Sequence, residues 1–458
     1  MKRYILFSAF LTLCLCSIHG AGYNETTRDS ILQLITGASS VGEKTSILKF
    51  GAKAGGNKDC HKAFVKAMKA AKKKGGLHLV VPRGVWLVKG SIHLESNVTL
   101  ELQDGTTLRF DANPEYYLPA VETSWEGTYV RNYSPFIYGY GLHNVSIIGK
   151  GTIDGNCATT FATWRELQKP AQQRSRDLNH QGTAIDKRAF GEGDYLRPQL
   201  IQLYKCKGIT IKDVFITNSP FWCIHLLQSE NIICRGIRYD AKLVNNDGID
   251  PESSRNIFIE DVQFNNGDDN VAIKAGHDND GWTLGKPTEN IVIRNCHFKG
   301  LHAVVIGSEM SGGVRNVFIE DCNYAGYCKR GLYIKTNPDR GGFVRNIYAR
   351  NLKFDEVEDL IFITSMYAGE GMDNIHFTDI ENLWFENIDC RKARHGGIIL
   401  QGTEAKPLRH ITMKNINISE VPNALSMDFT EGITFQDCHF GKKAGVPTQA
   451  SKRDNVFK

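Results

Sequence analysis

Three carboxylates within one short stretch of this 458-residue chain have the type and spacing of catalytic groups. Asp247 lies in Asn-Asn-Asp-Gly-Ile-Asp (245–250), and Asp268 and Asp269 lie in Gly-Asp-Asp (267–269), each just ahead of a short apolar run. Crowded carboxyl groups raise one another's pKa, so one can stay protonated as an acid while others stay ionised as bases. Hydrolysis of a glycosidic bond requires this pair of roles. Taken singly, each motif is also consistent with an Asn/Asp/Gly turn.

A recurring pattern predicts the elements that hold these carboxylates. From Asn144 onward the chain repeats a polar residue, then apolar residues at offsets one, three, six and eight, often with Asp, Asn or Gly at offset five. The alternation predicts two strands in each copy, and the break at offset five predicts a sharp bend between them. After a variable link, a further short apolar strand follows, as at 271–273 and 304–306.

Stacked coils of several strands each form a parallel β-helix, so we predict an all-β, single-domain fold of that class over residues 49–440. A leucine-rich repeat has a regular Leu/Asn frame, and a propeller has longer and steadier periods. Neither matches this chain. A helix at 59–74 precedes the strands and is expected to cap the open end of the core. Its apolar face consists of Ala63, Phe64, Ala67, Met68 and Ala71.

Stacking brings residues that are distant in the sequence into columns, because equivalent positions of successive coils lie about 4.8 Å apart. Alignment of the third strands makes Asn246, Asp269, His302 and Arg330 equivalent. Each lies five residues before a member of a second column, which consists of Pro251, Lys274, Gly307 and Lys335. A lone His is more often structural than catalytic. Because His302 adjoins the coil that carries two Asp residues, we predict one functional patch.

Ten of the 12 cysteines follow the N-terminal leader, and an even number in an exported protein suggests disulfides. However, Cys296, Cys322 and Cys438 fall at offset six, where other copies carry Val, Ile or Leu. We therefore expect these three to be interior apolar residues. Cys322 with Cys328 is the pair that a disulfide could join.

The N-terminus predicts export. Residues 1–21 begin with Lys2 and Arg3, continue as an apolar run and end in Gly20 and Ala21, as a secretory signal does. We expect cleavage after Gly20 or Ala21, and a periplasmic or extracellular protein. Without the leader, the formal net charge falls from +5 to +3, and no Lys/Arg stripe with interleaved aromatics indicates nucleic-acid binding. No other run reaches the length of a membrane span.

Three segments lie outside the repeat. Residues 22–48 form an N-terminal lead-in, and 441–458 form a polar C-terminal tail. Residues 156–198 are polar and charged and include Trp164, Arg165 and Glu166. We predict a long excursion there at one edge of the sheet, either a disordered surface loop or a place where binding residues gather.

The functional motifs resemble, in order, the four polygalacturonase motifs of glycoside hydrolase family 28. They are Asn-Asn-Asp-Gly-Ile-Asp (245–250), Gly-Asp-Asp (267–269), Leu-His-Ala (301–303) and Tyr-Ile-Lys (333–335). The flanks Ser-Pro-Phe-Trp (219–222) and Ile-Gly-Ser-Glu (306–309) are similar as well. The resemblance implies a right-handed parallel β-helix and an inverting hydrolase of the α-1,4-galacturonide linkages of pectin. It implies no metal and no cofactor.

The resemblance also implies a role for each motif residue. Asp268 would be the general acid, while Asp247 and Asp269 would hold and deprotonate the attacking water. His302 would tune or orient the acid, and Lys335 would bind a substrate carboxylate. The residues expected to bind substrate are Asn245, Arg330, Tyr333 and Lys335.

This sequence departs from the family motifs at two positions. Ala303 follows the His where the family usually has Gly, and Tyr333 stands where the family has Arg. The bidentate grip of Arg on a carboxylate is therefore lost. Either Arg330 compensates, or the substrate is rhamnogalacturonan or a substituted galacturonan.

Two other functions are consistent with this scaffold. Clustered carboxylates bind Ca²⁺, as in a calcium-dependent pectate lyase, but that reaction also needs a base of high pKa, for which the patch offers only Arg330. A non-catalytic carbohydrate-binding or adhesive β-helix is the second alternative, since fold does not imply activity. The intact set of three Asp residues argues against it. We expect a monomer that acts on a pectic polysaccharide or oligogalacturonide.

Overall fold

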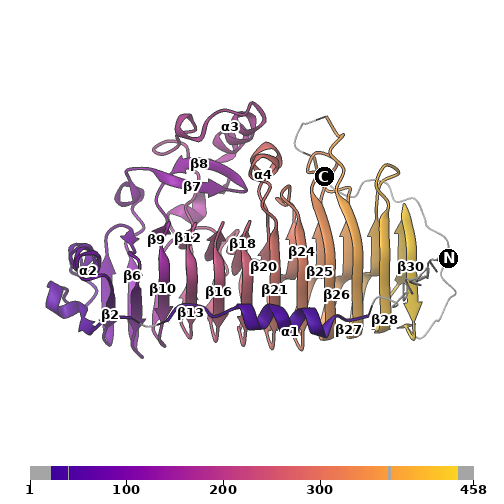
Figure 1. Cartoon of the computed structure of the whole chain (residues 1–458), viewed down its shortest axis with the longest axis horizontal. Helices are drawn as coiled ribbons and strands as arrows, with labels where there is room; N and C mark the ends of the chain where they lie inside the picture. Colours follow the sequence, from indigo (N-terminus) through magenta and orange to yellow (C-terminus); the bar gives the residue numbers. More distant parts are fainter. Residues whose placement is uncertain (1–21, 40, 370–372, 442–458) are drawn as a thin grey trace, which may run out of the picture.

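The computed structural model describes residues 22–39, 41–369 and 373–441, and over this part the chain forms an elongated parallel β-helix (Figure 1). Three rows of strands run along the molecule, and most coils contribute one strand to each row. The predicted fold is confirmed. The predicted leader (1–21) and most of the predicted tail (442–458) lie outside the described residues. No helix of the described part is long and apolar enough to cross a membrane.

The first row, here called the site face, carries the functional residues. Its strands are β4 (Ile92–His93), β9 (Ile137–Tyr140), β12 (Ile201–Tyr204), β15 (Ile224–Leu227), β18 (Ile249–Glu252), β20 (Asn266–Ile273), β23 (Gly300–Gly307), the ends of β25 (Asn323–Lys335), β26 (Phe343–Thr364) and β27 (Asp379–Gln401), and β29 (Asn423–Asp428).

The second row holds the first strand of each sequence repeat. It consists of β1 (Lys44–Ser46), β2 (Leu77–Val81), β5 (Val98–Leu102), β10 (His143–Ile148), β13 (Lys207–Lys212), β16 (Glu230–Arg235), β19 (Arg255–Glu260), β21 (Thr288–Arg294), β24 (Val314–Glu320), the first parts of β26, β27 and β28 (Leu408–Glu420), and β30 (Thr430–Gln436).

The third row follows the predicted bend. It consists of β3 (Gly84–Val88), β6 (Thr106–Phe110), β11 (Thr152–Asp154), β14 (Phe215–Thr217), β17 (Arg238–Asp240), β22 (His297–Phe298), the start of β25, the middle of β26 and β27, the end of β28, and β31 (His439–Phe440).

The bend between the second and third rows explains the polar residue at offset five. Asp213, Gly236, Asp261 and Asn295 have φ values of 64°, 64°, 55° and 53°. Gly, Asn and Asp tolerate this left-handed backbone conformation better than other residues. The repeat therefore marks the turns of the coil as well as its strands.

The interior of the coil is a continuous apolar core, and it contains most of the cysteines. Cys296 and Cys322 are buried as predicted, whereas Cys438 is only partly buried against the core, and the described cysteines all carry free thiols. The suggested bridge between Cys322 and Cys328 is therefore wrong. Cys322 Sγ instead donates to the Glu320 carbonyl (3.1 Å) and accepts a bond from the Cys296 amide (3.4 Å).

Helix α2 (His61–Lys74) closes the end of the core beside β2, as predicted (Figure 1). The five apolar residues of its predicted face are all buried, and the helix ends at Gly75, whose φ of 78° suits glycine. The short 3-10 helices η1 (Ile47–Phe50) and η2 (Pro114–Tyr117) lie in the same N-terminal region of the chain.

The lead-in does not stay near the cap. Helix α1 (Glu25–Leu34) lies lengthwise against the outside of the coils (Figure 1). Ile31 packs there with Phe258, Val292 and Phe318, and Tyr23 donates a hydrogen bond to Glu320, which is 297 positions away (2.7 Å). We call residues 22–39 the N-terminal strap.

The excursion at 156–198 is ordered. It forms η3 (Phe161–Arg165), α3 (Lys169–His180) and η4 (Ile185–Lys187), and with the hairpin β7 (Val121–Trp125) and β8 (Thr128–Asn132) it makes a ridge above the site face (Figure 1). A second apolar core holds the ridge down, and it consists of Trp125, Val130, Ala171, Phe190, Leu196, Phe221 and Trp222. Ion pairs of His180 with Asp278 (2.9 Å) and of Arg188 with Asp280 (2.6 Å) join the ridge to α4 (Asp278–Leu284).

Candidate active site

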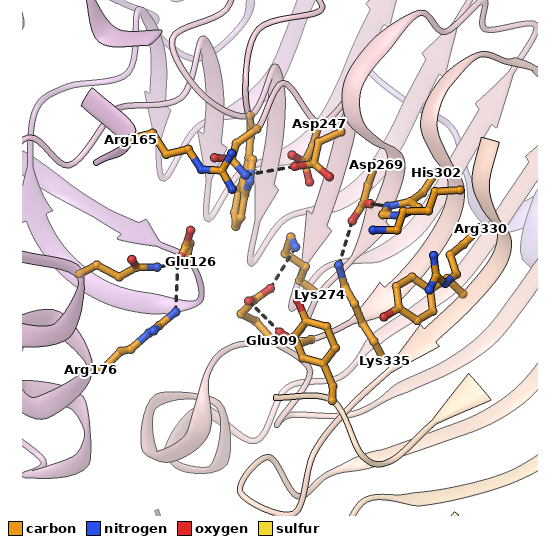
Figure 2. A pocket seen from close by; sticks show the side chains of 18 residues that line it. Glu126, Arg165, Arg176, Asp247, Asp269, Lys274, His302, Glu309, Arg330 and Lys335 are labelled. Atoms are coloured by element: carbon orange, nitrogen blue, oxygen red, sulfur yellow. Dashed lines mark hydrogen bonds and ion pairs between the residues drawn. The ribbon is translucent and has the colours of Figure 1, made fainter. Parts of the chain in front are cut away.

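A pocket of about 400 Å³ lies on the site face beside the ridge (Figure 2). All eight residues that the sequence proposed for catalysis and binding line this pocket. They are Asn245, Asp247, Asp268, Asp269, His302, Arg330, Tyr333 and Lys335. Residues from four separate parts of the chain are thus brought to one place by the stacking of the coils.

The predicted column is correct on one side of Asp269 and wrong on the other. Asp269 pairs with His302, and His302 pairs with Arg330, as expected. On the preceding coil, however, Ile249 pairs with Val271 and Glu252 with Lys274, so Asn246 and Pro251 are each one residue out of register. The side-chain amide of Asn246 is instead buried, where it donates to the carbonyls of Ser219 (2.9 Å) and Phe221 (3.0 Å).

Asp269 is held in the ionised form by two neighbours. His302 Nδ1 donates to one carboxylate oxygen (2.6 Å), and Lys335 Nζ lies 3.4 Å from the other. Burial raises the pKa of Asp269, but Lys335 and His302 outweigh burial and bring this pKa below its usual range. Lys335 therefore contacts the Asp269 carboxylate as well as lining the pocket.

Asp268 has the opposite environment. Burial and the adjacent charge of Asp269 raise its pKa, which favours the protonated form. Asn245 Nδ2 donates to Asp268 (3.1 Å), and Arg197 donates to Asn245 Oδ1 (2.7 Å). Arg197 is fully buried, and burial lowers its pKa to about 10. The Asp268 carboxyl group is therefore oriented by a chain of hydrogen bonds that begins at Arg197.

Asp247 lies deep in the pocket, and its side chain is nearly inaccessible. Burial and the neighbouring Asp250 raise the pKa of Asp247 well above its usual range. Two of the three catalytic candidates, Asp247 and Asp268, thus take up protons readily, while Asp269 stays ionised. Carboxyl groups whose environments separate their pKa values in this way can divide acid and base roles.

Arg330 and Tyr333 line the pocket but are engaged with the protein. The guanidinium of Arg330 pairs with Asp359 (3.2 Å). The Tyr333 ring stacks on Phe362 with 5.3 Å between centroids and meets the edge of His302 at 5.6 Å. Where the family motif has Arg, this chain therefore places an aromatic surface.

The described part contains groups of His, Asp and Glu donors close enough to share one metal ion, and Asp268, Asp269 and His302 form one of them. In this group, both oxygens of Asp269 already contact His302 and Lys335. A second group, of His180, His277 and Asp278, adjoins Arg340, whose guanidinium donates to Asp278 (2.8 Å). In each of these two groups a cationic side chain of the protein, Lys335 or Arg340, therefore contacts one of the carboxylates.

Comparison with known proteins identifies the class of enzyme to which this pocket belongs. Residues 77–434 match the family model described as "Glycosyl hydrolases family 28". The chain belongs to glycoside hydrolase family 28. A probable polygalacturonase from Vitis vinifera is 31% identical over 410 residues, which cover 85% of this chain and 78% of that protein. An endo-polygalacturonase from Pectobacterium carotovorum subsp. carotovorum is 29% identical over 344 residues, which cover 72% of this chain and 77% of that one.

A solved structure of the same family is similar over nearly the whole chain. The hyperthermoactive exopolygalacturonase from Thermotoga maritima superposes with a TM-score of 0.88 and 32% sequence identity, covering 92% of this chain and 97% of that one. Together with the family match, these relatives show that the chain is a polygalacturonase-type hydrolase that acts on the galacturonide linkages of pectin.

The family 28 pocket also contains residues for which no role was predicted. Lys274 Nζ donates to Glu309 (3.0 Å) and lies over the Trp222 ring, 4.6 Å from its centroid. The resemblance in 219–222 and 306–309 pointed to these segments but assigned them no role. From the ridge come Glu126, Arg165, Gln172 and Arg176, which no periodicity of the repeat could reveal.

Proposed function

We propose that this polygalacturonase-type enzyme removes galacturonate from the ends of homogalacturonan chains, by a single displacement with inversion. Asp268, Asp247 and Asp269 are its catalytic groups. The observation that carries the end-directed action is the ridge, which supplies one wall of the pocket that contains all three carboxyl groups. The similar Thermotoga maritima enzyme, named an exopolygalacturonase, is consistent with this action.

The catalytic step follows from the protonation of the carboxyl groups. Asp268, with its raised pKa, gives its proton to the leaving glycosidic oxygen as the bond to the anomeric carbon breaks. A water held by Asp247 and Asp269 attacks the same carbon from the opposite face and loses a proton to the base. Because water attacks directly, the product has the inverted anomeric configuration.

The ridge supports end-directed action because it is braced at the pocket wall. Glu126 of the hairpin accepts hydrogen bonds from Gln172 (2.7 Å) and Arg176 (3.3 Å) of α3 (Figure 2). A pocket closed at one end accepts a chain terminus, whereas an open groove lets a chain pass through. The wall therefore favours cleavage near a chain end.

Basic groups favour a carboxylate-bearing sugar even without the family's Arg. Lys335, Arg165 and Lys329 all line the pocket, and the latter two are exposed and form no ion pair within the described residues. Arg330 is partly neutralised by Asp359. We therefore assign carboxylate binding chiefly to Lys335, Arg165 and Lys329. We propose homogalacturonan as the substrate in preference to rhamnogalacturonan.

The test is product analysis on homogalacturonan, rhamnogalacturonan and xylogalacturonan. We expect galacturonate monomer from the first minutes on homogalacturonan, with viscosity falling slowly, and an inverted anomer by proton NMR of the early product. A mixture of oligomers with a rapid fall in viscosity would refute end-directed action. A retained anomer would refute the single displacement, and turnover only of another pectin would refute the substrate.

We also propose that the protein is exported and acts as a monomer. The leader at 1–21 supports export. The N-terminal sequence of protein recovered from the periplasm or medium, together with its mass in solution by light scattering, tests both points. An uncleaved cytoplasmic chain or a stable dimer would contradict them.

A further inference from the structure

Asp250 is the one carboxyl group of the 245–250 motif to which neither the resemblance nor the proposed mechanism gives a role. It lies in β18, three residues after Asp247, and its side chain is fully buried. It does not line the pocket, so it does not touch substrate. A buried carboxyl group so close to the reacting atoms needs a physical explanation.

The surroundings of Asp250 do not support an ionised carboxylate. Neither of its oxygens has a hydrogen-bond donor among the described residues. Its register partner on β15 is His225, but the two ring nitrogens of His225 are bonded to Glu252 (2.8 Å) and Gln202 (2.9 Å). An isolated buried carboxylate is costly, so such a group stays neutral.

The charged and titratable groups around Asp250 come from three adjoining coils. Asp247 lies on its own coil, Cys223 and Tyr239 come from the preceding stretch of chain, and Asp268, Asp269 and Lys274 come from the following coil. Lys274 is the cation of this set, and its Nζ is bound to Glu309. Burial is the largest cause that raises the pKa of Asp250, as it is for Asp247.

Asp247 and Asp250 lie within hydrogen-bonding reach of each other, so a proton on either group can be donated to the other. One oxygen of Asp247 likewise lacks a donor in the described part of the chain. One proton shared between the two groups satisfies both. Two carboxyl groups in contact titrate as a pair: the shared proton is held to a higher pH than an isolated Asp would hold it, and a second proton binds only at a lower pH.

We propose that Asp250 is a positioning residue that shares one proton with Asp247, so that the two carboxyl groups together form the general base. This inference rests on the proposed function. The pair begins with one proton and takes a second from the attacking water, whose oxygen bonds to the anomeric carbon. Asp268 gives its proton to the departing oxygen, and the proton of the pair returns to Asp268 through solvent afterwards. Asp269, fixed by Lys335 and His302, stays ionised and orients the water.

The first test is the pH dependence of kcat/KM for Asp250→Asn, with Asp154→Asn as the matched control. Asp154 is a buried carboxylate outside the pocket that pairs with Arg109 (3.0 Å). An amide at 250 can donate to Asp247 but cannot take up a proton. We expect kcat to fall about ten- to a hundredfold and the acidic limb of the profile to move to higher pH, because an amide donates a weaker hydrogen bond to the Asp247 carboxylate than a carboxyl group does. The control should leave the limb in place. An unchanged limb in Asp250→Asn would overturn the proposal.

A second test needs neither turnover nor a change at position 250. Infrared spectra at neutral pH compare Asp268→Asn, in which the acid is removed, with Asp247→Asn/Asp268→Asn. The first protein should retain the absorption of a protonated carboxyl group, and the second should lose it, because an amide at 247 can donate to an ionised Asp250. Equal absorption in both proteins would overturn the shared proton. Failure of galacturonan hydrolysis alone would instead overturn the proposed function.

Discussion

Lys335→Met removes the cation beside Asp269 while keeping a side chain of similar length. At 3.4 Å and an effective dielectric constant of about 20, the attraction between the two charges is about 5 kcal/mol. Loss of one partner from a buried ion pair typically costs about 3–5 kcal/mol, which agrees. A loss of this size is enough to raise the pKa of Asp269 from below its usual range, because burial then acts on this carboxyl group without the largest of the effects that oppose it.

The assay is the pH dependence of kcat/KM on homogalacturonan. In the native enzyme Asp269 stays ionised, so protonation of the Asp247–Asp250 pair alone sets the acidic limb. In Lys335→Met the Asp269 carboxylate also becomes protonated on the acidic side of the profile. We therefore expect the acidic limb to move to higher pH and to become steeper. The matched control is Lys329→Met, which removes an exposed cation of the same pocket and should raise KM without moving the limb. If both variants show the same limb, Lys335 does not fix the charge of Asp269.

Three further changes test other parts of the structure. Asp268→Asn should lower kcat about 10²–10⁴-fold with little change in KM, measured by reducing-sugar release from protein whose fold is verified by circular dichroism; retention of most activity would refute its role as the acid. Tyr333→Arg should lower the melting temperature without improving turnover of homogalacturonan, because it adds a cation beside Arg330 and Lys335. The charges of these two residues already lie 5.6 and 5.4 Å from the Tyr333 ring. A gain in turnover would mean that a substrate carboxylate reaches this position. Ile31→Ala should cost about 2–5 kcal/mol of stability in a denaturant titration; no change would mean that the strap contributes no packing energy.

The repeat predicted most of the fold because nearly every position of the coil requires either a particular backbone conformation or a side chain of a particular polarity. Residues such as Asp261 and Asn295 occur where the backbone needs a positive φ, and residues such as Cys296 occur where a side chain enters the core. Both requirements can be read from sequence spacing alone. The column from Asp269 to Arg330 followed from the same requirements.

The predictions that failed depended on contacts that these requirements do not include. The register at Asn246 shifted because its amide bonds to carbonyls of the preceding coil, a contact that strand periodicity does not encode. The ridge has no repeat, and its position comes from a separate apolar core and from ion pairs such as Arg188–Asp280. Wherever a site residue comes from such a segment, as Arg176 does, only the three-dimensional structure identifies it.

The N-terminal strap places a constraint on the order in which this chain completes its fold. Residues 22–39 leave the ribosome before the rest of the described chain, yet Ile31 packs on Phe318, and Tyr23 binds Glu320. Synthesis at about 5–20 residues per second makes that docking surface many seconds after the strap itself. During this interval the strap can contact only the coils already made, as Ser39 does at Asn144 (2.7 Å) and Ala38 at Thr210 (2.9 Å), and the apolar cluster around Ile31 is incomplete. The earliest part of the enzyme is thus fully fixed only once the coils up to Glu320 exist, and a nascent chain that stops before Phe318 leaves part of the strap's apolar face open to chaperones or to other chains.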